Sequence, residues 1–222
     1  MGKFFSVDSP LYQFMNRLFD MLKLNFLWLL FSLPVVTMGA ATTAAYTVTL
    51  RMVDDREGYI FEPFWNAFKA NLKKGSIIGV ILEVASYAAY LDFQLYHASG
   101  KLMFLIIGIV AIFLLVMHMV YAFPLLARYE NSVINTLRNS YSIAAKYFGR
   151  TLFILVIVAL EFAFCIWNEK MYIFLILLGP ACMILTVSGM AMSLFHKIET
   201  ENEEMTAKAQ EEENTSGNED AD

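Results

Sequence analysis

Long apolar runs separated by short polar links dominate the chain between residues 75 and 195. The runs cover about 75–96, 102–127, 151–167 and 171–195. A helix rises about 1.5 Å per residue, so about 20 such residues cross a hydrocarbon core of about 30 Å. The pattern therefore predicts four membrane-crossing helices. The short links at 97–101 and 168–170 predict that these helices form two antiparallel pairs.

The first apolar region, from Leu24 to Val53, is too long for one ordinary crossing. As a single helix it would span about 45 Å. Pro34 and Gly39 lie near its middle, and proline both removes a backbone donor and clashes with the preceding turn. Two interpretations remain. One is a long, kinked crossing; the other is a hairpin of two segments, about 11–33 and 39–53, that turns between Pro34 and Gly39.

The distribution of cations favours the hairpin. The links 51–74 and 128–150 hold five and four Lys or Arg residues, whereas the links 97–101 and 168–170 hold one each. Cytoplasmic loops are enriched in Lys and Arg, which predicts that both long links are cytoplasmic. A hairpin also keeps Lys3, Arg17 and Lys23 on that side. We therefore predict an all-α, polytopic membrane bundle of five to six segments, with both termini in the cytoplasm.

Each long cytoplasmic link contains an amphipathic stretch, at about 60–74 and 131–148. Aromatic and aliphatic residues share one helical face in each stretch, and Asn, Lys and Arg occupy the opposite face. Such helices lie in the membrane interface, with their cations directed at anionic lipid. Pro63 suits the first turn of the first helix, and Asn131 or Ser132 is a suitable cap for the second.

Composition and charge divide the chain into a membrane domain, residues 1–198, and an acidic tail, residues 199–222. Apolar residues make up 58% of the chain and charged residues 17%. Soluble domains have a smaller apolar fraction and a larger charged fraction. The net charge of −5 is unevenly distributed, because the tail alone holds ten acids and a single lysine. Because the tail lacks aromatic and branched aliphatic residues, we expect it to be disordered and cytoplasmic. It is either a solvated appendage or an electrostatic partner for a basic protein or for the basic links. The cations of the membrane domain form no dense patch, so we expect no nucleic-acid partner.

Three ionisable residues lie inside the predicted crossings, namely Glu83, His118 and Glu161. Burying such groups in hydrocarbon costs at least a few kcal/mol, so they are candidates for binding a ligand or an ion. If their helices pack together, they would line a polar cavity. The alternative is that each glutamate is protonated and hydrogen-bonded to a neighbouring helix, which would serve assembly alone.

Motifs typical of enzymes are absent from the sequence. It contains no P-loop, no G-x-S-x-G and no H-E-x-x-H. Its three histidines and two cysteines do not cluster, so we expect neither a metal nor a cofactor. The small residues that follow Gly39 are explained by close helix packing, or by a broken helix that lines a site.

Two strings, LPVVTMGAATTA (33–44) and FPLLARYENS (123–132), carry a resemblance to a known family. From about Leu24 to Lys197 the chain resembles the YesL-like family of uncharacterised bacterial membrane proteins, which carry domain of unknown function 624. The resemblance implies a multi-pass protein of a Gram-positive-type plasma membrane with a link to carbohydrate uptake. It transfers no functional residues.

Taken together, these features predict a non-enzymatic accessory or regulatory membrane protein associated with carbohydrate uptake. Its expected partners are the lipid bilayer and a carbohydrate ABC permease or membrane sensor. The alternative is a small-solute or sugar transporter that uses the intramembrane glutamates.

Overall fold

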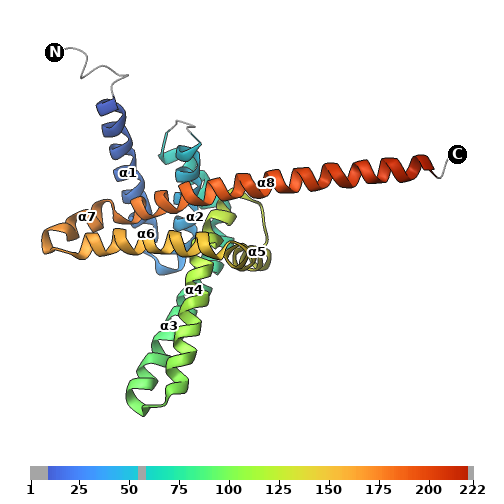
Figure 1. The fold of residues 1–222 in the computed structure, drawn as a ribbon. Coiled ribbons are helices and arrows are strands. Elements are labelled where there is room, and N and C mark those ends of the chain that lie inside the picture. Colours follow the sequence, from blue (N-terminus) through green and yellow to red (C-terminus); the bar gives the residue numbers. More distant parts are fainter. Residues whose placement is uncertain (1–9, 55–58, 220–222) are drawn as a thin grey trace.

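A computed structural model describes residues 10–54 and 59–219 of the chain, and within them all regular structure is helical. Two of the predicted cytoplasmic cations, Lys3 and Arg56, lie outside the described residues. Short 3-10 turns cover Val35–Thr37 and Glu169–Met171. The α-helices are α1 (Pro10–Ser32), α2 (Met38–Val53), α3 (Phe61–Ser99), α4 (Leu102–Arg128), α5 (Val133–Lys146), α6 (Phe148–Ile166), α7 (Tyr172–Leu177) and α8 (Gly179–Glu219). Figure 1 shows α3 and α4 as a hairpin that projects from the body, while α6 and α8 run across it.

The first apolar region is broken into two helices, as the hairpin interpretation predicts. α1 ends at Ser32, and α2 begins at Met38 after the turn that contains Pro34. The Thr37 hydroxyl donates to the carbonyl oxygens of Phe31 and Pro34, at 2.8 and 2.9 Å, and thereby satisfies backbone groups that the break leaves open. Trp28 of α1 then donates its indole N–H to the Thr42 hydroxyl of α2 at 3.0 Å. The two helices therefore pack against each other.

The small residues at the start of α2 permit a backbone-to-backbone contact with α3. A Cβ atom built on Gly39 would lie 2.2 Å from the carbonyl oxygen of Gly75 and 2.8 Å from the Cα of Gly79. Gly75 and Gly79 form a small-xxx-small pair, the spacing that lets membrane helices approach closely. Close packing, the first of the two explanations of this run, thus accounts for the small residues.

The predicted interfacial helix at 60–74 is not a separate helix. α3 runs without interruption from Phe61 to Ser99 and joins that stretch to the predicted crossing at 75–96. Gly75 does not end the helix, because it packs on the backbone of Ala40, where a side chain would not fit. The apolar face of the stretch packs into the body, where Phe64 and Phe68 are buried beside Phe31 of α1.

The second amphipathic stretch does form its own helix, α5, and Ser132 caps it by accepting a hydrogen bond from the backbone N–H of Asn135. The face of α5 that is buried is a stripe of small residues, Thr136, Ser140 and Ala144, rather than the larger apolar residues beside it. Ile134 remains 77% exposed. Small side chains bring α5 close to α4. Val133, Leu137 and Ile143 pack partly against the core, whereas Ile134 and Tyr141 remain exposed.

The predicted crossing at 171–195 is interrupted at Leu178, which separates α7 from α8. Pro180 has no amide N–H to donate to the Ile176 carbonyl four residues earlier, and its ring clashes with that turn. Asn25 of α1, which is 1% exposed, bridges the break. Its amide donates to the Ile176 carbonyl at 2.8 Å and its oxygen accepts from the Ala181 N–H at 3.2 Å.

The predicted disordered tail is also different in the structure, because α8 continues as a helix to Glu219. Residues 220–222 lie outside the described residues. Two physical reasons explain the difference. The segment is rich in Glu, Ala, Lys and Gln, which are good helix formers. Because it extends a helix that is already packed, it also avoids the unfavourable nucleation step.

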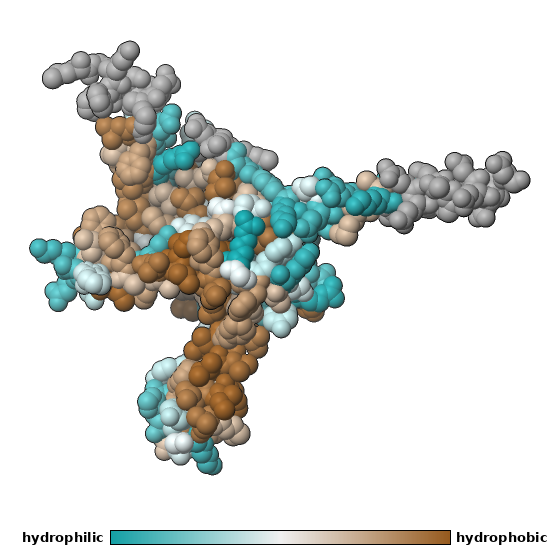
Figure 2. Space-filling model, viewed as in Figure 1, coloured by the Kyte–Doolittle hydropathy of each residue, from teal (hydrophilic) through white to brown (hydrophobic). Residues whose placement is uncertain are grey.

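Four helices in the described part of the chain are long and apolar enough to cross a membrane, namely α3, α4, α6 and α8. This is fewer than the five to six segments predicted. α2 has 16 residues and rises about 24 Å, which is short for a core of about 30 Å. α1 carries Arg17, Asp20 and Lys23 along its length. In Figure 2, hydrophobic residues cover the α3–α4 hairpin up to a polar tip, as expected of surface that contacts lipid.

Candidate functional site

The three ionisable residues singled out from the sequence do not meet in one cavity. Glu83 lies on α3, His118 on α4 and Glu161 on α6. Within the described residues α3 and α6 make no contact with each other, so the two glutamates are held apart. The predicted polar cavity lined by all three is therefore not formed.

Each of these residues has its own surroundings. Glu161 is partly buried and accepts a hydrogen bond of 2.5 Å from the Thr186 hydroxyl of α8. Its second oxygen is buried and has no hydrogen-bond partner among the described residues. The Nδ1 atom of His118 lies 2.8 Å from the Leu114 carbonyl, and its ring stacks on Tyr141 of α5 with 6.1 Å between centroids. Glu161 thus joins α6 to α8, and His118 joins α4 to α5.

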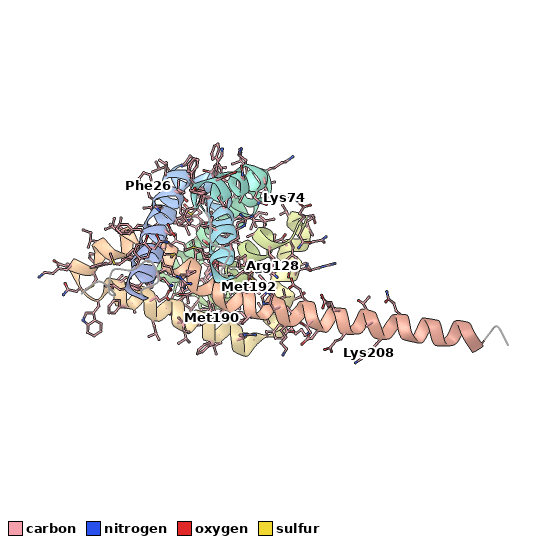
Figure 3. The ribbon with its side chains drawn as sticks, turned by 90° about the horizontal axis from the view of Figure 1, so that it is seen from above. Phe26, Lys74, Arg128, Met190, Met192 and Lys208 are labelled. Atoms are coloured by element: carbon pink, nitrogen blue, oxygen red, sulfur yellow. The ribbon has the colours of Figure 1, made fainter. Side chains whose placement is uncertain are left out.

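A polar cluster that we call the clamp connects α8 to the ends of α4 and α5. Its first half is Arg128, Tyr129 and Glu199. The guanidinium of Arg128 donates to both carboxylate oxygens of Glu199, at 3.0 and 2.9 Å, and the Tyr129 phenol donates to the same carboxylate at 2.5 Å. Such bidentate, charge-assisted pairs are among the stronger polar contacts in proteins. Figure 3 shows Arg128 beside Met192, where α8 passes the end of α4.

The second half of the clamp repeats this arrangement at the end of α5. Lys146 donates to Glu201 at 3.3 Å, and the Tyr147 phenol donates to the same oxygen at 3.2 Å. Each half is therefore a cation followed by a tyrosine, and each half holds one glutamate of α8. This half is more exposed, with 65% of the Lys146 side chain accessible against 21% of the Arg128 side chain. Because water screens exposed pairs, the Arg128 half is the stronger one.

Raised pKa values keep Tyr129 and Lys146 of the clamp protonated, so that both can donate hydrogen bonds. Burial, together with the bond to Glu199, raises the pKa of Tyr129 to about 12. The pKa of Lys146 is raised above its ordinary value by the hydrogen bond of Lys146 to Tyr147 and by its pairing with Glu201. Tyr129 is therefore a neutral donor and Lys146 a cation throughout the physiological range.

An open, polar groove of about 850 Å³ lies beside the first half of the clamp. Three helices form it, and we call it the polar groove. α2 contributes Thr47 and Arg51, and the end of α4 and the residues after it contribute Arg128, Tyr129 and Glu130. The wall from α3 follows one helical face through Glu62, Pro63, Asn66, Ala67, Ala70, Asn71 and Lys74. Arg128 belongs to both the groove and the clamp.

Sequence reasoning found neither site directly. The tail was considered as an electrostatic partner for the basic links, and Glu199 and Glu201 fit that alternative because both contact the link 128–150. The repeated Arg-Tyr and Lys-Tyr pairs at 128–129 and 146–147 were the available signal. The groove residues are spread from Thr47 to Glu130, so their meeting depends on how α2 packs between α3 and α4.

Apolar helices, hydrophobic outer surfaces and polar tips define an integral membrane protein with several helical segments. Residues 21–93, from the second half of α1 through most of α3, match the family described as "Protein of unknown function, DUF624". The uncharacterised protein YteU of Bacillus subtilis (strain 168) is similar as well, with 27% identity over 112 residues.

These findings support a DUF624/YesL-like family, which confirms the resemblance read from the sequence. The similarity to YteU covers 48% of this chain and 50% of the relative, so the two match over about half of their lengths. No solved structure matches the chain. The family description names no function, and the fold alone does not assign one.

Proposed function

We propose that the protein is a non-enzymatic accessory or regulatory component of a bacterial plasma-membrane assembly. One observation carries the proposal. Beyond the clamp, α8 extends as a helix to Glu219, and its described side chains from Asn202 to Lys208 are exposed. Beyond the two glutamates of the clamp, residues 202–219 hold six glutamates and one lysine. A helix that protrudes with this charge suits recognition of a basic surface on another protein.

The clamp supports this role because it fixes where the extension leaves the membrane body. Arg128 and Lys146 hold α8 at two points two residues apart, Glu199 and Glu201. A flexible acidic tail would lose conformational entropy when a partner orders it. A helix that is already attached loses less, so the clamp favours binding.

Orientation follows from the cations of the same region. If the four long apolar helices of the described chain all cross the membrane, the residues before α3 and those after α8 lie on the same side, whether or not the α1–α2 hairpin also crosses. Arg51, Lys69, Lys73 and Arg138 lie at the ends of the body that carry the long links. We propose that this side is the cytoplasm, because cytoplasmic loops are enriched in Lys and Arg. The partner we propose, a carbohydrate permease or membrane sensor, rests on the family resemblance.

Photo-crosslinking in native membranes tests the proposal. A photoreactive amino acid at Glu203 or Ala207 samples the extension, and the same amino acid at Phe164, which is 69% exposed on α6, serves as the control in lipid. We expect adducts with a permease or sensor subunit from the extension but not from Phe164. Adducts of the same kind from all three positions, or no protein adduct from the extension, would refute the proposal.

A transporter is the second candidate, and Glu161 is the observation that favours it. A carboxylate with one buried, unpartnered oxygen in a membrane helix suits the binding of a proton or a cation. The variants Glu161→Gln and Glu83→Gln, each expressed at wild-type level, would abolish uptake in vesicles if this is correct. Unchanged uptake with both variants would end the idea.

A further inference from the structure

The polar groove brings three cations together from three helices. Arg51 comes from α2, Lys74 from α3 and Arg128 from the end of α4. Their positions in the sequence are far apart, so only the packing of these helices assembles them. The groove volume of about 850 Å³ lies within the range of small-molecule sites, about 300–1,000 Å³.

Two of these cations have unused binding capacity. Arg128 is already paired with Glu199. Arg51 and Lys74, in contrast, have no ion pair or side-chain hydrogen bond with any residue in the described part of the chain. A guanidinium and an ammonium in one groove suit a phosphate group, the first as a fork of donors and the second as a point charge.

The remaining polar residues of the groove suit hydroxyl groups. The carboxylates of Glu62 and Glu130 and the hydroxyl of Thr47 are acceptors for hydroxyl hydrogens. Asn66 adds an amide donor and an acceptor. Asn71 uses one amide hydrogen on the Ala67 carbonyl at 3.1 Å, which leaves its oxygen and its second hydrogen available. A bare anion would leave these groups unused.

The groove also lies beside the start of the apolar stretch of α3. Lys69 and Lys73 are exposed on the same part of α3, just before the apolar stretch that begins at Gly75. Basic pockets between membrane helices on the cytoplasmic side are typical sites for anionic lipid headgroups. We propose that the polar groove binds a phosphate group flanked by hydroxyl groups, as presented by phosphatidylglycerol or by a soluble polyol phosphate.

Native mass spectrometry of the detergent-purified full chain tests the site. The lipid arm compares phosphatidylglycerol with phosphatidylcholine, and the soluble arm uses glycerol 3-phosphate. The test variants are Arg51→Gln and Lys74→Gln. Lys73→Gln is the matched control, because it removes the same charge from an exposed neighbour that does not line the groove.

We expect one tightly held phosphatidylglycerol, at least tenfold weaker retention in both test variants, and wild-type retention in Lys73→Gln. Binding of glycerol 3-phosphate with the same variant pattern, and no lipid preference, would support the site and identify a soluble ligand. Equal losses in the test and control variants would indicate general charge attraction and overturn the proposal. Equal retention of phosphatidylglycerol and phosphatidylcholine, together with no binding of glycerol 3-phosphate that depends on Arg51 and Lys74, would also overturn it. Two controls separate loss of the site from loss of the fold. Each variant should unfold at the wild-type temperature without added ligand, and Arg51→Lys, which keeps the charge, should restore binding.

This proposal does not depend on the accessory function. The groove can bind its ligand whether or not the α8 extension recognises a partner, and the two experiments measure different residues.

Discussion

The contact between Gly39 of α2 and the Gly75–Gly79 pair of α3 offers a quantitative test of how the bundle is held together. Gly39→Ala adds one methyl group. The added Cβ atom would meet the Gly75 carbonyl oxygen at 2.2 Å and the Gly79 backbone at 2.8 and 2.9 Å. All three atoms are backbone atoms, so no side chain can rotate to make room.

The magnitude follows from the distance that the helices must move. Ordinary contact begins at 3.4 Å, so α2 and α3 must separate locally by about 1.2 Å. A gap of 0.5–1 Å already removes about a quarter to a half of the dispersion energy between facing atoms. Overpacking of this kind costs about 1–3 kcal/mol. Alanine is favoured over glycine within a helix by about 1 kcal/mol, which offsets part of the loss.

Gly189→Ala in α8 is the matched control, because a Cβ atom there meets no atom within 4 Å. It has the helix-propensity gain without the clash. We therefore expect Gly39→Ala to unfold more easily than Gly189→Ala by about 1–3 kcal/mol in mixed micelles of mild detergent and SDS. Tryptophan fluorescence reports the transition, since Trp28 hydrogen-bonds across the α1–α2 hairpin. Equal unfolding midpoints for the two variants would show that this close approach is not what stabilises the bundle.

Three further predictions concern polar contacts. Glu199→Gln should release the α8 extension at a cost of about 1–3 kcal/mol, because it breaks the bidentate pair, whereas Glu201→Gln should cost less, because water screens its exposed pair with Lys146. Faster hydrogen exchange at 199–208 in the first variant only is the expected result, and equal exchange in both would contradict the ranking. Raising the salt concentration should weaken the pair of Lys146 before that of Arg128, which double-mutant cycles at low and high salt can measure. Asn25→Ala should leave the α7–α8 break without its partners and cost about 1–3 kcal/mol for each orphaned backbone group, seen as faster exchange at the Ala181 amide; an unchanged amide would mean that water replaces the side chain without loss.

Sequence periodicity predicted the elements that depend on local properties. The apolar runs and their short links identified α4, α6, the part of α3 that follows Gly75 and the first part of α8. Pro34 correctly indicated a break in the first apolar region, because proline acts on its own backbone and the preceding turn. Ser132 was among the expected caps of α5, for the same local reason.

Properties that depend on contacts between distant residues were not predicted. The amphipathic stretch 60–74 and the apolar run 75–96 were predicted as separate helices, whereas α3 continues through Gly75, which packs on the backbone of Ala40. The helical extension of α8 depends on a packed helix before it and on cations at 128 and 146. Glu83 and Glu161 were reasonable partners by composition, but α3 and α6 make no contact in the described part of the chain. The polar groove required the packing of three helices to be known.

The uninterrupted course of α3 has a mechanical consequence. Its 39 residues rise about 58 Å, nearly twice the thickness of a hydrocarbon core of about 30 Å. The helix carries the wall of the groove near one end and stops at the other end at Gly100, whose left-handed backbone closes the last turn. A stiff rod of this length transmits a tilt applied at Lys74 to the opposite face of the bilayer without any hinge between them. A ligand that tilts α3 when it binds in the polar groove would therefore displace the turn at Gly100 at the other end of the helix.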